Sequence, residues 1–359
     1  AGVNFIIGNA SSVIFNRGTS VNTQYIAART YNNLSISGAD NNKSISGAVT
    51  VNGTFTLNIT GTSTITGLGN ITFGNGATIV RTAGSFDGTP TFGSSVNLNY
   101  NGTTAIASGV EIPSDATKLS NLTLNNTAGL TLGGATKVNG ILTLTAGALT
   151  NGSNLTLGNS ASIVRTAGSL DAAPTFGTAI DVTYNGTSAI SGGYEIPSST
   201  SVLQNLTLNN AGGLTLGSDV TLNKTLTLTS GKLSVAAGKK LTLPSSTATI
   251  SGAGSTNYIV TANDGTNIGK VKLTGFATAK TLPVGTANYY LPVTLTPASS
   301  SDFEVSVFQG ATTNGALGGT AVDADKKLNI VDAVWTVNRT SGSGNCDLQM
   351  SWDAALEGA

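Results

Sequence analysis

The chain has 359 residues, of which 9% are charged, with 17 basic and 17 acidic side chains and no histidine. This balance gives no electrostatic indication of a nucleic-acid or anionic-membrane partner. The lack of histidine removes the commonest general base and the commonest metal ligand. No apolar run approaches the roughly 20 residues of a membrane-spanning helix. With 46 glycines and apolar residues that alternate within short segments, the composition predicts a nearly all-β fold.

Residues 1–77 form a degenerate first copy of a repeat. Residues 13–20, 32–38 and 51–57 resemble segments further along the chain, with small insertions between them. Because the pattern is already under way at the first residue, we expect the natural cap of the repeat array to lie elsewhere.

Two clearer copies follow, over residues 78–161 and 162–250. Residues 79–145 and 163–229 align without a gap at a spacing of 163 − 79 = 84, and 40 of the 67 aligned positions are identical. Within each copy leucine alternates with threonine, as in residues 121–133 and 205–217, which is the pattern of a strand with one buried face. Each copy therefore supplies short, one-sided strands that need stacked neighbours.

A shorter period lies inside the 84-residue repeat. Leu122 and Leu142 are 20 residues apart, as are Leu206 and Leu226, and about 20 residues is the length of one coil in a parallel β-helix. We predict a parallel β-helix or β-solenoid with about four coils in each repeat and about twelve over residues 1–247. Residues 85–93 and 169–177, which place proline before an aromatic ring, are expected to be loops or edge strands that bulge from one side.

From residue 251 the pattern changes to longer strands, and both tryptophans lie here. Five or six alternating strands predict an immunoglobulin-like β-sandwich over residues 251–359. We expect this domain to be incomplete at its C-terminal end, with Trp352 beside an open sheet edge. Cys346 is the single cysteine, and we interpret it as a thiol buried in a strand.

Several phrases resemble the large, repeat-rich surface and secreted proteins of Bacteroidota: NLTLNN, GLTLGG, VNGILTLTAGALTNGSNLTLG, LPVGTANYYLPVTLTP and LNIVDAVWTVNR. The resemblance covers nearly the whole chain. It implies an adhesin-like or other extracellular protein, exported by the type IX secretion system, in which β-solenoid stretches precede a sandwich module. Members of this group usually continue beyond the position of Ala359 into further strands and a C-terminal sorting domain.

Three charged positions occur twice, at equivalent places in the two clear repeats. They are Arg81 and Arg165, Asp87 and Asp171, and Glu111 and Glu195. Polysaccharide lyases and hydrolases also use parallel β-helices, and they need paired carboxylates or a basic residue beside a calcium-binding acidic cluster. We favour a structural role, such as an Arg–Asp pair that fixes the proline loop, and predict no enzymatic activity.

Four repeated aromatic residues are candidates for a ligand-facing surface: Phe92, Tyr100, Phe176 and Tyr184. The interpretation that we favour packs these rings under the proline loops. Calcium is a second candidate, at residues 262–267 and 323–327, but these segments lack the spaced carboxylates of known calcium loops and are predicted to be turns without a cofactor.

Thr-x-Thr arrays, at residues 143–145 and 225–229, would stack into ladders like those of ice-binding solenoids. Threonine is also the polar residue best suited to an exposed strand, and this is the interpretation that we favour.

The predicted function is that of an extracellular structural protein on the outer cell surface, a stalk, adhesin or self-assembling fibre subunit. Exposed strand edges would join copies into a homo-oligomer or filament, and the near-zero net charge removes repulsion between them. The alternative is a protein that binds or cleaves polysaccharide along the side of the solenoid. No feature of the sequence indicates a nucleic-acid partner.

Overall fold

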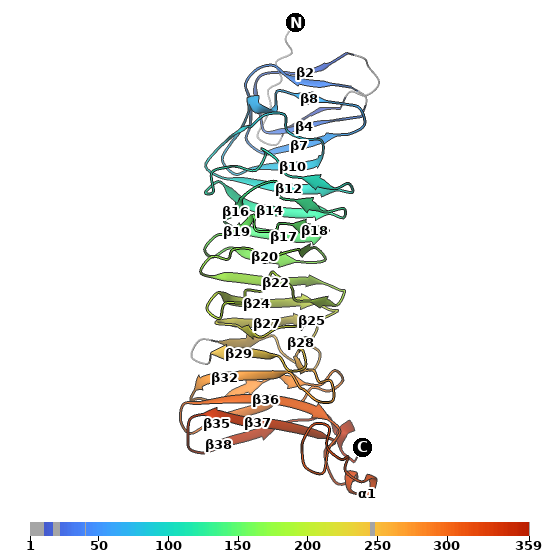
Figure 1. The fold of residues 1–359 in the computed structure, drawn as a ribbon, viewed down its shortest axis with the longest axis vertical. Helices are drawn as coiled ribbons and strands as arrows, with labels where there is room; N and C mark the ends of the chain where they lie inside the picture. Colours follow the sequence, from blue (N-terminus) through green and yellow to red (C-terminus); the bar gives the residue numbers. More distant parts are fainter. Residues whose placement is uncertain (1–10, 17–21, 40, 245–247, 359) are drawn as a thin grey trace. The chain divides into compact units, whose positions relative to one another are not determined.

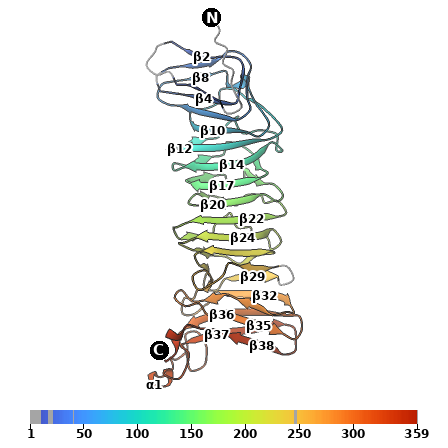
Figure 2. The same ribbon diagram turned by 180° about the vertical axis from the view of Figure 1, so that it is seen from behind.

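The computed structural model describes residues 11–16, 22–39, 41–244 and 248–358. The chain divides into two compact units, Ala1–Thr178 and Ala179–Ala359, which are called unit 1 and unit 2. Figures 1 and 2 show the strands of each unit from opposite sides. The few helical turns among the described residues are all too short to cross a membrane.

Unit 1 is a parallel β-solenoid. Neighbouring strands of its longest sheet pair in parallel, with partners 19 to 25 residues apart. In spatial order this sheet contains β1 (Ser12–Phe15), β4 (Asn33–Gly38), β7 (Thr54–Ile59), β10 (Ala77–Ala83), β12 (Val96–Gly102), β14 (Leu119–Asn126), β17 (Ile141–Ala146) and β20 (Ser162–Arg165). Each coil adds one strand to this ladder, so the predicted solenoid is confirmed.

Shorter parallel ladders complete the coils of unit 1. One contains β2 (Gln24–Ile26), β5 (Lys43–Ile45) and β8 (Ile65–Thr66), and a second contains β3 (Thr30–Tyr31), β6 (Val49–Val51), β9 (Ile71–Phe73) and β11 (Thr91–Phe92). A third contains β13 (Ile106–Ala107), β15 (Leu130–Thr131), β18 (Ala148–Thr150) and β21 (Ser169–Leu170), beside the pair β16 (Thr136–Val138) and β19 (Leu155–Leu157). The turn η1 (Leu68–Asn70) precedes β9.

The alternation of leucine and threonine explains the core. Leu122 pairs with Leu142, and both side chains are fully buried, whereas the paired Thr123 and Thr143 lie on the outer face. Burying one leucine stabilises the fold by roughly 1.5–3 kcal/mol, and every coil repeats this contribution against the next. The core is therefore continuous through the unit, although each residue contacts only neighbouring coils.

Asparagine side chains connect successive coils at their corners. The Oδ1 atom of Asn33 accepts a hydrogen bond from the amide of Thr54 (2.8 Å), and that of Asn121 accepts one from Ile141 (2.7 Å). Gly147 also belongs to a corner: its φ is +81°, and a Cβ there would collide with the carbonyl oxygen of Asn126. Only glycine fits a position with both constraints.

Unit 2 begins with the same architecture. One parallel ladder contains β22 (Ile180–Gly186), β24 (Leu203–Asn210), β27 (Thr225–Ser230) and β30 (Thr249–Ser251). A second contains β23 (Ile190–Ser191), β25 (Leu214–Leu216), β28 (Leu233–Val235), β31 (Ile259–Thr261) and β34 (Val284–Gly285), and a third begins with β26 (Val220–Thr221), β29 (Lys240–Pro244) and β32 (Lys270–Phe276). Leu206 pairs with Leu226 in the first of these ladders, as the 20-residue spacing predicts.

The last strands of unit 2 are antiparallel. β36 (Ser301–Gln309) pairs with β32 and β37 (Ala333–Ser341) pairs with β36, while β35 (Val293–Pro297) lies between β33 (Lys280–Leu282) and β38 (Cys346–Met350). The short helix α1 (Ala324–Lys327) lies between β36 and β37, and the helical turn η2 (Ala354–Leu356) follows β38.

The sequence predicts that the solenoid ends near residue 251, but in the structure the solenoid continues past it. Parallel pairing continues beyond it, through β31, β32 and β34. The sequence concealed this because Leu233 pairs with Ile259, a spacing of 26 residues that departs from the regular coil. The immunoglobulin-like sandwich is not confirmed, since β36 and β37 extend a sheet of the solenoid rather than starting a separate one.

Candidate functional site: a buried Arg–Glu–Tyr cluster

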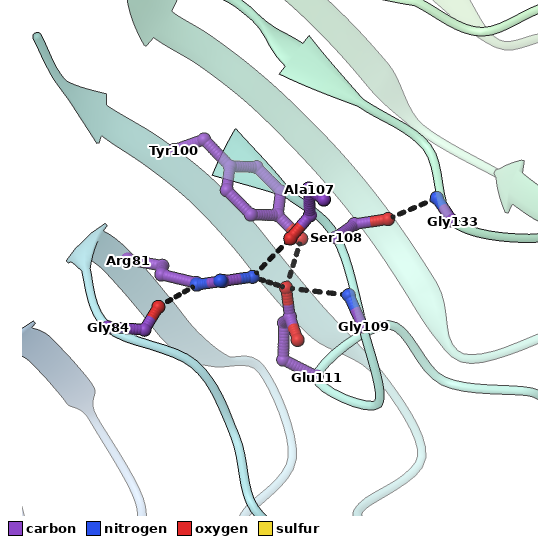
Figure 3. Close-up of polar contacts among 8 residues, drawn as sticks. All are labelled: Arg81, Gly84, Tyr100, Ala107, Ser108, Gly109, Glu111 and Gly133. Carbon is purple, nitrogen blue, oxygen red and sulfur yellow. Dashed lines mark hydrogen bonds and ion pairs between the residues drawn. The ribbon is translucent and has the colours of Figure 1, made fainter. Parts of the chain in front are cut away.

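The strongest concentration of polar chemistry in unit 1 is a buried cluster of Arg81, Tyr100 and Glu111 (Figure 3). Arg81 on β10 is the register partner of Tyr100 on β12, and both occupy inward positions of their strands. Glu111 comes from the loop after β13. A charged side chain in an inward row is costly unless it is paired, so the three residues depend on one another.

One oxygen of Glu111 connects the cluster. Its Oε1 atom lies 2.5 Å from Nη1 of Arg81 and accepts hydrogen bonds from the Tyr100 hydroxyl (2.9 Å) and the Gly109 amide (3.1 Å). Arg81 also donates to the carbonyl oxygens of Ala107 (2.8 Å) and, through Nε, of Gly84 (2.7 Å). Figure 3 shows these bonds meeting around the Glu111 carboxylate and the Arg81 guanidinium. The cluster therefore fixes the loop after β13 onto the sheet.

Burial controls the chemistry of this cluster. Glu111 and Tyr100 are 0% exposed and Arg81 is 7% exposed. Burial, and then the neighbouring Glu111 carboxylate, raise the pKa of Tyr100 well above its usual value. The phenol thus stays protonated at neutral pH and donates its hydrogen bond. All three side chains are held in one hydrogen-bonding arrangement and are buried away from solvent.

The second carboxylate oxygen of Glu111 has no hydrogen-bond partner, although it is buried. A Cβ placed on Gly109 would lie 3.2 Å from it, which is tight packing. Glycine at position 109 therefore leaves room for the carboxylate, and the ion pair with Arg81 compensates for its burial.

Unit 2 contains an equivalent arrangement. The hydroxyl of Tyr184, on β22, donates to Oε1 of Glu195 (2.7 Å), and so does the amide of Gly193 (3.0 Å). Both side chains are buried. In unit 1, Arg165 at the end of β20 donates through Nε to the carbonyl of Gly168 (2.7 Å), as Arg81 does to Gly84. Each unit thus has one buried tyrosine whose hydroxyl donates a structural hydrogen bond to a glutamate.

A small groove lies next to the cluster in unit 1. Its volume is about 370 Å³, and its walls include Ser108, Val110, Pro113 and Gly133. The Ser108 hydroxyl accepts a hydrogen bond from the Gly133 amide (2.9 Å), which is visible in Figure 3. The groove walls offer hydroxyl, backbone and apolar groups. Glu111, which is paired with Arg81, is not one of the residues that line the groove.

The predicted Arg–Asp pair is wrong for the first clear repeat. Arg81 pairs with Glu111, while the two oxygens of Asp87 accept the amides of Gly67 (2.7 Å) and Leu68 (2.8 Å) at the start of η1. Backbone amides presented by a tight turn are an alternative partner for a carboxylate, and sequence spacing does not reveal them.

Asp171 has a similar role at the corresponding corner. Its Oδ1 atom accepts the amides of Asn151 (2.7 Å) and Gly152 (3.2 Å). Both repeated aspartates therefore bind the backbone of the preceding coil.

The four aromatic candidates do not form a common surface. Tyr100 and Tyr184 are fully buried, so the prediction that they face a ligand is wrong for these two. Phe92 is half-buried and stacks on Phe73 with ring centroids 6.0 Å apart, and Phe176 is also half-buried. The inward alternation of β12 and β22 explains the burial of the tyrosines.

Of the two candidate calcium segments, residues 262–267 form a turn, and residues 323–327 are the N-cap and the four residues of the helix α1. Asp264 accepts the amides of Thr266 (2.9 Å) and Asn267 (2.6 Å), and the bond from Asn267 is the main cause of the lowered pKa of Asp264. Asp323 forms an exposed ion pair with Lys326 (2.8 Å). Within the described ranges no group of three acidic or cysteine side chains lies close enough together to hold a metal ion.

The predicted threonine ladders are present on the outer face. Thr207 pairs with Thr227, and the hydroxyls of Thr225 and Thr249 lie 3.2 Å apart. Nothing in this arrangement separates an ice-binding role from ordinary strand preference, so both interpretations stay predictions.

Comparison with protein-family models, curated proteins and solved structures found no match to this chain. The buried cluster is the feature that sequence reasoning missed. A signal was present in the position of Arg81, two residues after the apolar Ile79. Residues two apart in a strand lie on the same face, so Arg81 points inward with Ile79. An inward arginine requires a buried anion, and Glu111 is the repeated carboxylate nearest after the next strand.

Proposed function

We propose that this chain is an extracellular structural protein, a cell-surface stalk, adhesin or fibre subunit, which acts through the geometry of its coils. The observation that carries the proposal is the buried Arg81–Glu111–Tyr100 cluster. Of the duplicated groups with catalytic potential in unit 1, the glutamate and the tyrosine are used to hold a loop against the sheet. A protein whose buried charged groups hold its coils in place is suited to a mechanical or display role.

Exposed strand edges supply the contacts in this proposal. Among the described residues β1 pairs only with β4, and β37 and β38 each pair along one side with β36 and β35. An unpaired edge offers a row of amide and carbonyl groups to another strand. The low charge, 9% of residues, leaves little repulsion to oppose such contacts.

The proposal includes two finer features. The 84-residue sequence duplication is the unit by which the solenoid was extended. The two antiparallel sheets at the end of unit 2 face each other as a small sandwich of immunoglobulin-like character. Support for the sandwich comes from Val305 and Val307 on β36 and from Val293 and Leu295 on β35, all of which are fully buried.

Carbohydrate binding or cleavage is the competing function. It is favoured by the outer face of the long ladders, where amides and hydroxyls repeat in register, as in the hydrogen bond from Asn121 to Asn97 (2.8 Å). Such a face would bind a polysaccharide through many weak polar contacts.

The two functions are separated by incubating the purified chain with a panel of soluble and insoluble polysaccharides. Cosedimentation and the release of new reducing or unsaturated ends are measured, and negative-stain electron microscopy is performed in parallel. A structural protein leaves every polymer intact and shows discrete particles or ordered assemblies. Cleavage of any polysaccharide would overturn the proposal, and tight binding without cleavage would favour the competing function.

A further inference from the structure

Asparagine is followed directly by glycine at seven places in the chain: Asn52, Asn75, Asn101, Asn139, Asn151, Asn185 and Asn314. This dipeptide is the one most prone to spontaneous deamidation, because glycine has no side chain to obstruct its own backbone nitrogen. That nitrogen loses its proton and bonds to the side-chain carbonyl carbon of the asparagine, from which the amide nitrogen leaves as ammonia. Water then opens the resulting succinimide ring, and aspartate or isoaspartate is formed. Whether a pair reacts therefore depends on how the fold holds the glycine amide.

Three of these glycine amides are bound by a neighbouring coil. Each donates a hydrogen bond to a backbone carbonyl there: Gly53 to Asn32 (2.7 Å), Gly76 to Ser95 (2.8 Å) and Gly140 to Ser120 (2.7 Å). An amide that donates such a bond is held in its protonated form. It also cannot turn towards the asparagine side chain unless two coils separate.

The asparagine side chains at two of these corners are tied in the same way. The Oδ1 atom of Asn75 accepts the amide of Ser94 (2.7 Å), and Nδ2 of Asn139 donates to the carbonyl of Ala116 (2.9 Å). Two further pairs lie in the strands β12 and β22, where the register partners are Gly102 with Asn126 and Gly186 with Asn210. Reaction at any of these five pairs requires strands of the solenoid to come apart.

The pair Asn151–Gly152 is held by a side chain instead. The Oδ1 atom of Asp171 accepts the amides of Asn151 (2.7 Å) and Gly152 (3.2 Å), and Nδ2 of Asn151 donates to the carbonyl of Ala172 (3.1 Å). Asn151 is 1% exposed. The negative charge of the carboxylate opposes removal of the proton from the glycine amide. This pair therefore depends on one replaceable group.

The pair Asn314–Gly315 differs from the other six because it lies in an exposed loop, between β36 and α1. The Gly315 amide donates only within its own turn, to the carbonyl of Thr312 (3.1 Å). The Oδ1 atom of Asn314 accepts the amide of Ala316 (3.1 Å), which keeps the asparagine side chain beside the backbone that attacks it. A Cβ at Gly315 would meet nothing within 4 Å. This turn can open without moving a strand.

We infer that Asn314 is a site of spontaneous deamidation in the folded chain, and that the Asp171 carboxylate protects Asn151 from the same reaction. At Asn314 the neutral amide becomes a carboxylate, and the isoaspartate product also lengthens the main chain by one methylene group. The inference goes beyond the proposed structural function and does not depend on it, because it concerns the chemical lifetime of the chain.

Incubation of the full 359-residue chain in mildly alkaline buffer tests the site at Asn314. Peptide mapping by mass spectrometry, with aspartate and isoaspartate separated, gives the rate at each of the seven pairs. In the folded chain Asn314 should react roughly tenfold or more faster than each of the other six, because only its turn opens locally. In concentrated urea all seven should react at similar rates, because only the fold distinguishes them.

The repeat supplies a matched pair of variants for the role of Asp171. Asp171→Ala should raise the rate at Asn151 by about tenfold to hundredfold, the effect of losing a hydrogen bond to a charged acceptor. Asp87→Ala removes the equivalent carboxylate, which binds the amides of Gly67 and Leu68 and no Asn–Gly pair, and should leave that rate unchanged. Asp171→Asn keeps an acceptor oxygen without the charge and should give a smaller increase than Asp171→Ala.

Equal rates at Asn314 and the other pairs of the folded chain would overturn the inference for Asn314. An unchanged rate at Asn151 in Asp171→Ala, with circular dichroism showing a folded chain, would overturn the role of Asp171. A rise at Asn139 as large as that at Asn151 would reveal a general loosening of unit 1 and would also reject that role. None of these results bears on the proposed structural function, which fails only in the polysaccharide assays.

Discussion

Replacing Glu111 by alanine is the most direct test of the buried cluster. The change removes the acceptor shared by Arg81, Tyr100 and Gly109, and it leaves a guanidinium that is 7% exposed without its counter-ion. Breaking a buried ion pair from one side costs about 3–5 kcal/mol, because the remaining charge is uncompensated. We expect the free energy of unfolding of unit 1 to fall by this amount.

The assay is urea denaturation followed by circular dichroism, with hydrogen exchange of unit 1 peptides to localise the loss. Tyr100→Phe removes one hydrogen bond to the carboxylate and should cost about 1.5–3 kcal/mol. Asp325→Asn, on the exposed surface of α1, is the control and should change stability by less than about 0.5 kcal/mol.

A double variant separates charge burial from packing. Arg81→Met combined with Glu111→Leu removes both charges and keeps most of the volume, so it should be more stable than Glu111→Ala alone. A loss of less than about 1 kcal/mol for Glu111→Ala would refute the view that this cluster fixes the loop, since it would equal a single ordinary hydrogen bond.

Two further predictions concern a coil corner and the end of unit 2. Gly147→Ala should destabilise unit 1 by about 1–3 kcal/mol, because φ is positive there and the Asn126 carbonyl blocks a Cβ. Gly134→Ala, where a Cβ would point into open space, should not destabilise the unit. Thermal unfolding of both variants tests this difference. In unit 2, a hydrogen bond from Lys240 is the main cause of the lowered pKa of Glu304. A lowered pKa stabilises the fold above the unfolded pKa and loses that effect as pH falls through the folded one. The unmodified chain should therefore lose more stability than Glu304→Gln between about pH 5 and pH 3, and parallel pH profiles would count against the ion pair.

Periodicity predicted the parts of the fold that repeat. The 20-residue spacing of Leu122 and Leu142 is the register of β14 and β17, and the alternation of leucine with threonine separates core from surface. It did not predict contacts that depend on loop shape. Arg81 and Glu111 are 30 residues apart, and their meeting depends on the course of the loop after β13. The spacing of 26 between Leu233 and Ile259 likewise concealed the continuation of the solenoid.

The register of the parallel ladders bears on how such a chain evolves. Each coil presents to the next a surface like the one that it receives, so copying a whole number of coils adds length without a new core or a new joint. The 40 identities over 67 positions between residues 79–145 and 163–229 are what such a copying step would leave. Selection on a gene of this kind can change the reach of its product in steps of whole coils.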